Sequence, residues 1–164
     1  MAISISILSN SRFPEYERTI ENVLSFSPYI HVSLRRMFDK IRILVGFDGS
    51  SQSKKAVMES ITIAKCFSGY IKVVYVYGKG LKGKAETEVI EIKEKLRLAE
   101  VEHDVSLVLG SNPAEALLTI AKREDFALIA VGSRGLGSTM SILLGSVSKQ
   151  IVTKADCNVL VVKN

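Results

Sequence analysis

The residues best suited to chemistry lie in a glycine-rich segment that follows a run of apolar residues. They are spaced as Gly132-x2-Gly135-x9-Gly145-Ser146. Glycine lets backbone amides approach phosphate oxygens because no Cβ stands in the way. A serine at the start of a helix offers N–H groups, a hydroxyl and the positive end of the helix dipole. The spacing therefore predicts an anion-binding loop, although glycine and serine are also typical of a flexible linker.

Two further loops hold residues of chemical interest. The segment Gly46–Ser50 contains Asp48, a carboxylate that could hold Mg²⁺ or Mn²⁺ or activate a water molecule. The segment Gly78–Gly83 has the form GxGxxG between a predicted strand and a predicted helix, which is typical of dinucleotide binding. However, the next strand ends in Val-Leu-Gly110 and supplies no carboxylate for a ribose. We interpret Gly78–Gly83 as a flexible loop.

Composition and charge exclude several classes of protein. The chain has 164 residues, of which 47% are hydrophobic and 24% are charged, and this is typical of one globular domain. No apolar run approaches the ~20 residues that span a bilayer, so no membrane segment is predicted. The net charge is +5. Because the basic residues form no patch interleaved with aromatic residues, nucleic-acid binding is disfavoured.

The cysteines and the first ten residues indicate where the protein works. Cys66 and Cys157 are far apart and form no CxxC pair, so no zinc site is predicted. We expect two buried thiols in a reducing compartment. The amino terminus lacks the basic and apolar regions of a secretory signal. The predicted location is therefore cytoplasmic.

A regular alternation of strands and helices must position these loops. Because strand–helix–strand crossovers are right-handed, the alternation predicts an α/β fold, a three-layer sandwich with a five-stranded parallel sheet. Residues 37–164 form this domain, and residues 1–36 are an extension of uncertain order or the product of a start codon assigned too early. Strands are predicted at 41–47, 71–77, 105–109, 126–131 and 159–162, and helices at 52–67, 85–102, 113–123 and 146–154.

Three motifs together resemble the ATP-binding branch of the universal stress protein family. They are the glycine spacing of 132–146, the turn Gly-Phe-Asp-Gly-Ser of 46–50, and Gly-Ser-Asn-Pro at 110–113. The resemblance covers about residues 38–163. It implies an adenine nucleotide alpha hydrolase-like fold with strand order 3-2-1-4-5. In that order the Asp48 turn and the glycine-rich loop flank one crevice.

The resemblance also implies a set of ligand-binding residues for ATP with Mg²⁺ or Mn²⁺. Asp48 would serve the adenosine and the metal, and Arg134 is either an additional phosphate contact or a solvated arginine. The spacer of nine residues carries no basic side chain, so phosphate affinity would depend on backbone amides and on lysines of the 79–84 loop. The implied cofactor-binding residues are Gly46, Phe47, Asp48, Val76, Gly132, Arg134, Gly135, Gly145, Ser146 and Val147.

The function implied is an ATP-binding stress-response or signalling module with at most slow hydrolysis. By resemblance it is a homodimer paired through Val159–Val162, where Asn158 replaces the family's usual proline. A second hypothesis is a protein-interaction module that acts through its dimer surface and does not require nucleotide. A dedicated ATPase or nucleotidyl transferase is the least favoured, because no residue is evidently placed as an efficient base.

Overall fold

The computed structural model describes residues 40–135 and 144–163. The predicted extension 1–36, its boundary at Met37 and the middle of the glycine-rich loop lie outside these residues. None of the helices in the described ranges is long and apolar enough to cross a membrane.

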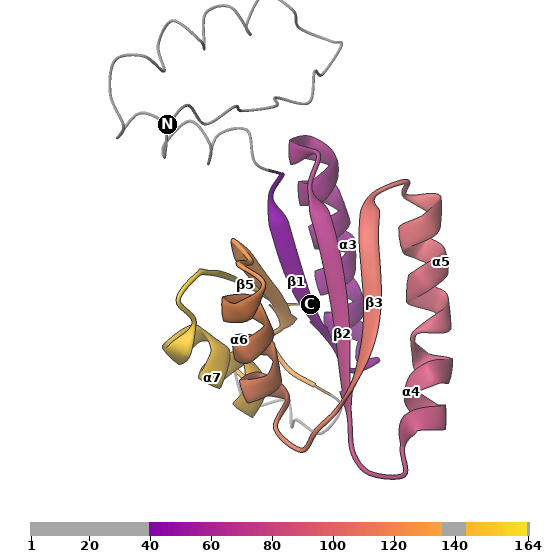
Figure 1. Ribbon diagram of the computed structural model, residues 1–164, viewed down its shortest axis with the longest axis vertical. Coiled ribbons are helices and arrows are strands. Elements are labelled where there is room, and N and C mark those ends of the chain that lie inside the picture. Colours follow the sequence, from indigo (N-terminus) through magenta and orange to yellow (C-terminus); the bar gives the residue numbers. More distant parts are fainter. Residues whose placement is uncertain (1–39, 136–143, 164) are drawn as a thin grey trace, which may run out of the picture. The chain divides into compact units, whose positions relative to one another are not determined.

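The predicted sheet is confirmed. Five parallel strands lie in the order β3-β2-β1-β4-β5, so the strand order reverses between β1 and β4. The carboxyl ends of β1, β2 and β3 point downward in Figure 1. The strands are β1 (Arg42–Phe47), β2 (Tyr70–Tyr77), β3 (Glu102–Leu109), β4 (Leu128–Gly132) and β5 (Asn158–Val162).

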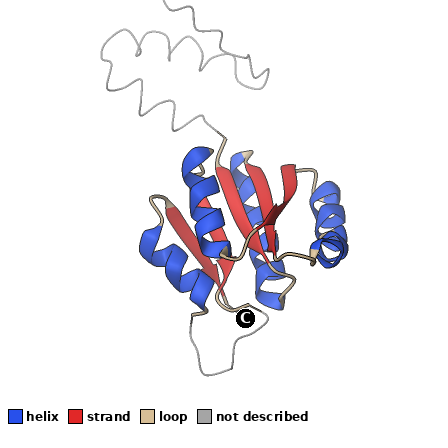
Figure 2. Cartoon of the chain, turned by 60° about the horizontal axis from the view of Figure 1, so that its bottom comes forward, coloured by secondary structure: helices blue, strands red, loops and turns tan. Residues whose placement is uncertain are grey.

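Helices cover both faces of the sheet, as Figure 2 shows. One face carries α3 (Ser51–Phe67), α4 (Lys82–Glu88) and α5 (Ile90–Leu98), and the other carries α6 (Pro113–Arg123) and α7 (Ser146–Lys154). Ser50 and Asn112 cap α3 and α6, because each side chain accepts a hydrogen bond from the third backbone amide of its helix. Both caps stand where the sequence predicts the start of a helix.

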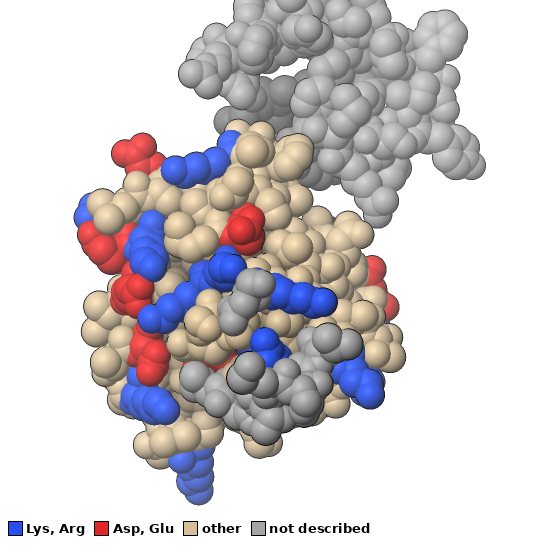
Figure 3. All heavy atoms as spheres, turned by 180° about the vertical axis from the view of Figure 1, so that it is seen from behind, with Lys and Arg blue, Asp and Glu red and all other residues tan. Residues whose placement is uncertain are grey.

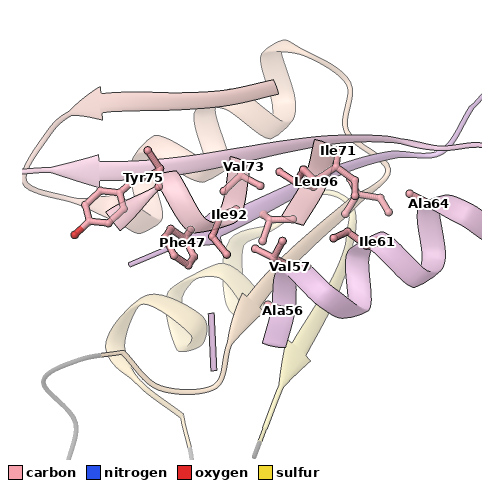
Figure 4. Packing of buried hydrophobic residues seen from close by; sticks show 14 of the residues in the cluster. Phe47, Ala56, Val57, Ile61, Ala64, Ile71, Val73, Tyr75, Ile92 and Leu96 are labelled. Carbon is pink, nitrogen blue, oxygen red and sulfur yellow. The ribbon is translucent and has the colours of Figure 1, made fainter. Parts of the chain in front are cut away.

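Two apolar clusters, one on each face, hold the three layers together. Figure 4 shows the first cluster, in which alternate side chains of β1 and β2 meet α3 and α5. Several of its members are completely buried: Ile43, Val45, Val57, Ile71, Val73, Ile92 and Leu96. The second cluster places Leu44, Val74 and Ile129 against Leu117 and Ile151 of α6 and α7. The strands therefore contribute apolar side chains to both faces, as parallel strands do.

The second predicted helix differs from the structure at both ends. It begins at Lys82 rather than 85, divides at Val89 into α4 and α5, and stops at Leu98 rather than 102. Glu100 adopts a left-handed backbone conformation with φ of 55°, which ends the helix. As a result β3 begins at Glu102 rather than at 105.

The prediction of two buried cysteines is wrong for one of them. Cys66, in the last turn of α3, is exposed, whereas Cys157 is partly buried beside the second apolar cluster. Burial raises the pKa of the Cys157 thiol, and the neighbouring Asp156 carboxylate adds to the rise. The thiolate is the reactive form of cysteine. The two thiols therefore differ in reactivity.

We expect a thiol reagent such as Ellman's reagent to modify Cys66 first and Cys157 more slowly at pH 7.5. Cys66 is exposed, and the raised pKa keeps Cys157 protonated. The measurement is the time course of absorbance for the folded protein and for a Cys66→Ser variant. Equal rates for the two thiols, or a fast phase that survives in the variant, would contradict the expectation.

Candidate functional site

All ten residues implied by the sequence line one cavity of about 480 Å³. The cavity lies beyond the carboxyl ends of β1 and β4, where the strand order reverses and where open α/β sheets bind ligands. Its size is within the range of small-molecule sites, roughly 300–1,000 Å³. The structure brings together Gly46, Phe47, Asp48, Val76, Gly132, Arg134, Gly135, Gly145, Ser146 and Val147.

One wall of the cavity is apolar, and Val76 is the only one of its residues that was predicted from the sequence. The wall adds Val74 of β2, and Pro113 and Leu117 of α6, to the predicted Val76. A sequence signal for Val74 existed, because residues two apart on a strand share a face. Leu117 carried a weaker signal, since it lies one turn after the start of α6. The remaining lining residues are Ser53, Val131, Leu144 and Ser148.

The first glycine of the motif is required by packing rather than by a ligand. A Cβ on Gly132 would lie 2.7 Å from the Cβ of Gln52 and 2.9 Å from the backbone nitrogen of Ser53. Both belong to the first turn of α3, so the end of β4 touches that helix. Gly46 is less constrained, because a Cβ there would lie 2.7 Å from a terminal methyl carbon of Leu117, which belongs to a flexible side chain.

The other two motif glycines face different surroundings. A Cβ on Gly135 would lie 2.5 Å from Oδ2 of Asp48, so this glycine makes room for the carboxylate. A Cβ on Gly145 would meet no atom closer than 3.5 Å, which is ordinary contact. Gly145 therefore has space for a side chain, and only the use of the cavity itself would argue against one.

The Asp48 carboxylate holds the turn that follows β1. Its Oδ1 accepts hydrogen bonds from the Ser50 backbone amide at 3.0 Å and from the Ser50 hydroxyl at 2.6 Å. The Asp48 amide donates to the Ser53 hydroxyl at 3.4 Å. Because Oδ2 lies against Gly135, the carboxylate contacts both loops that form the crevice. Among the described residues that line the cavity, Asp48 is the only acidic one.

The amino terminus of α7 contributes the backbone donors of the cavity. The first amides of a helix have no carbonyl partner within it, and Gly145 has no side chain with which to cap them. The amides of Ser146 and Val147 therefore suit an anion. The Gly145 amide is already engaged, because it donates to the Ser133 carbonyl at 2.7 Å.

Two other predicted contributions to the cavity, from Phe47 and from the lysines of the 79–84 loop, are smaller than expected. The Phe47 side chain is 3% exposed and packs edge-to-face on Tyr75, with ring centroids 6.0 Å apart. Figure 4 shows both rings within the first apolar cluster, so Phe47 offers the cavity its backbone. The lysines at 79, 82 and 84 do not line the cavity. Lys82 instead pairs with Glu86 across one turn of α4 at 3.7 Å.

Charges around the cavity are sparse. Arg134 is half-buried and makes no ion pair with any residue in the described ranges. Across those same ranges, no group of three or more His, Cys, Asp or Glu side chains could hold a metal ion. On the face in Figure 3, Lys and Arg alternate with Asp and Glu along one side. Near the crevice, burial raises the pKa of the Tyr75 hydroxyl, with smaller effects from Glu88 and Asp48.

Comparisons with known proteins agree with this geometry. The sequence profile of the universal stress protein family matches residues 41–163. A universal stress protein of Thermus aquaticus, encoded 3′ of QAH/OAS sulfhydrylase, is 35% identical over 74% of this chain and 97% of its own length. Universal stress protein MJ0531 of Methanocaldococcus jannaschii is 30% identical over 86% of this chain and 94% of its own.

Solved structures show the same arrangement. Protein MJ0577 superposes with a TM-score of 0.67 at 26% identity, over 76% of this chain and 96% of its own. A universal stress protein solved in complex with cAMP has a TM-score of 0.65 at 26% identity, over 76% of this chain and 97% of its own.

We expect Gly132→Ala to destabilise the fold and Gly145→Ala to leave it unchanged. The first substitution forces a Cβ against the backbone of α3, and overpacking of this kind costs roughly 1–3 kcal/mol. For a domain of this size the Tm should fall by about 3–12 °C. Gly145 has φ of −70° and free space, so its Tm should change little. Thermal unfolding followed by circular dichroism compares the two, and equal Tm values would contradict the assignment.

Proposed function

The chain belongs to the universal stress protein family, and we propose that it is an ATP-binding stress-response or signalling module. The observation that carries the proposal is the uncapped amino terminus of α7 in a cavity that also has an apolar wall. A relative of similar structure was solved with cAMP, which supports an adenine nucleotide as the ligand. The proposed location is the cytoplasm.

Each part of an ATP molecule has a suitable surface in the cavity. The apolar wall of Val74, Val76 and Leu117 suits the flat adenine ring. Asp48 can accept hydrogen bonds from ribose hydroxyls, because a carboxylate has about four acceptor positions. The amides at the start of α7 suit the phosphates, and the Arg134 guanidinium, which lines the same cavity, can reach toward the same charge.

A metal ion would depend on the nucleotide for most of its ligands. Mg²⁺ and Mn²⁺ prefer oxygen ligands and commonly bind through one or two carboxylates plus substrate phosphates. Asp48 supplies the carboxylate among the described residues that line this cavity. We propose that Asp48 holds the ion together with phosphate oxygens and water, where the ion would neutralise the charge of the phosphates.

At most slow hydrolysis fits the residues of the cavity. A general base must lie within hydrogen-bond reach of the attacking water and be free to take its proton. No histidine or cysteine is among the residues that line the cavity. Asp48 is already engaged with Ser50. A binding or switching role therefore suits this cavity better than rapid turnover.

Pairing of two copies through β5 is the second part of the proposal. The two edge strands of the sheet differ in chemistry. β3 carries Glu102, Asp104 and Ser106, and charged side chains protect an edge from pairing. β5 reads Asn-Val-Leu-Val-Val, and Val159, Leu160 and Val161 are only partly buried. An uncharged apolar edge is a template for a second strand, which favours a homodimer through Val159–Val162.

A different function remains as the alternative. A protein-interaction module could keep this fold and act through the β5 edge without any nucleotide. Binding of ATP is the measurement that distinguishes the two.

We expect titration calorimetry with Mg-ATP to give saturable heat below about 1 mM, a threshold for weak binding. Gly145→Val should abolish the heat, because the side chain would enter the cavity beside Arg134. The matched control is Gly83→Val, whose Cβ meets nothing within 4 Å and lies outside the cavity. No heat from the unsubstituted chain at 1 mM would refute ATP binding and favour the alternative. Equal loss in both variants would refute the assigned site.

We also expect Val159→Lys to convert a dimer into a monomer, because a charge on the edge strand opposes pairing. Ser106→Lys on the opposite edge is the control and should remain dimeric. Sedimentation equilibrium gives both molecular masses. A monomeric unsubstituted chain, or a variant at position 159 that stays dimeric, would exclude this interface.

A further inference from the structure

Ser133 and Ser148 form a buried junction between the two ends of the glycine-rich loop. Each residue is 2% exposed. The Ser148 hydroxyl lies 3.0 Å from the Ser133 carbonyl oxygen and 3.0 Å from the Gly145 carbonyl oxygen. Its single proton is therefore shared between one acceptor at the start of the loop and one at its end.

Backbone hydrogen bonds reinforce the same junction. The Gly145 amide donates to the Ser133 carbonyl at 2.7 Å, and the Ser133 amide donates to the Val162 carbonyl at 2.7 Å. The Lys149 amide donates to Gly145 at 2.9 Å as the first regular bond of α7. The end of β4, the end of β5 and the first turn of α7 thus meet at Ser133.

We propose that Ser148 is a positioning residue for the phosphate site. Its hydroxyl fastens the loop ends together, and this sets where the amides of Ser146 and Val147 lie relative to Gly135. Ser148 is among the residues that line the cavity, but its hydroxyl is engaged with the Ser133 and Gly145 carbonyls, so the hydroxyl would act on a ligand through the loop ends. This inference rests on the proposed ATP binding, and it adds a residue to which neither the glycine motif nor the resemblance had given a role.

The energetic case follows from burial. Removing the hydroxyl leaves the Ser133 carbonyl with its Gly145 partner, but the Gly145 carbonyl then keeps only the Lys149 amide. A typical buried hydrogen bond changes stability by an amount that corresponds to about a threefold to tenfold change in an equilibrium constant. If Ser133 and Gly145 separate more often, the amides of Ser146 and Val147 are in place for a smaller fraction of the time, which weakens apparent affinity.

The test uses Ser148→Ala, Ser148→Thr and the control Ser60→Ala in the full chain. Ser60 is also a buried serine in a helix, and its hydroxyl donates to the Ala56 carbonyl at 2.7 Å, but it is not among the residues that line the cavity. The first readout is tryptic cleavage after Arg134, identified by mass spectrometry, and it needs no nucleotide. The second is the affinity for Mg-ATP from calorimetry, and the Tm of each variant accompanies both.

We expect Ser148→Ala to be cleaved faster after Arg134 and to bind ATP about threefold to tenfold more weakly. Ser148→Thr retains the hydroxyl and should restore both values, and Ser60→Ala should match the unsubstituted chain in both. Unchanged cleavage in Ser148→Ala would mean that the hydroxyl does not hold the loop ends together. Faster cleavage with unchanged affinity overturns the positioning role. If the unsubstituted chain binds no ATP, the proposed function and the positioning role both fail. The cleavage rates then still show whether the Ser148 hydroxyl holds the loop ends together.

Discussion

The close approach of β4 to the first turn of α3 sets the geometry of the whole site. Gly132 ends β4, and the space that a side chain would occupy there is filled by Gln52 and the backbone of Ser53. Because β1 and β4 are neighbours in the sheet, this contact brings the Asp48 turn beside the glycine-rich loop.

The four glycines of the site have different physical reasons for being glycine. A side chain at Gly132 would meet the backbone of α3, one at Gly46 would displace the flexible end of Leu117, and Gly135 makes room for the Asp48 carboxylate. A Cβ on Gly145 would make only ordinary contacts, so only there does the absence of a side chain suggest a ligand. A motif that reads as a single phosphate-binding pattern thus combines packing, positioning and binding.

The junction at Ser133 connects the site to an edge of the sheet. Ser133 contacts Val162 at the end of β5, and β5 is the strand proposed to pair with a second copy. The loop ends, α7 and the edge strand therefore share one group of hydrogen bonds. A change in the β5 edge and a change at the phosphate site would both alter the hydrogen bonds of Ser133. These bonds are a physical route for linkage between the two sites.

The sequence was informative where a residue's local role coincides with its place in the fold. Ser50 and Asn112 mark helix starts because a cap needs only its own helix, and the apolar runs of β1 and β4 mark central strands because both faces are covered. The sequence was misleading at β3, an edge strand that begins with charged residues and follows a left-handed Glu100. Neither feature has a pattern that separates it from a helix.

The sequence by itself determined the alternation of strands and helices, because periodicity indicates it directly, and its motifs carried the resemblance that implied the family and ten of the residues that line the cavity. The tertiary structure decided how those residues are used. In the folded chain the Phe47 ring lies in the core, the Gly145 amide donates to the Ser133 carbonyl, and Cys66 is exposed. Each of these outcomes depends on which distant atoms come within contact distance, and spacing along a chain carries no record of that.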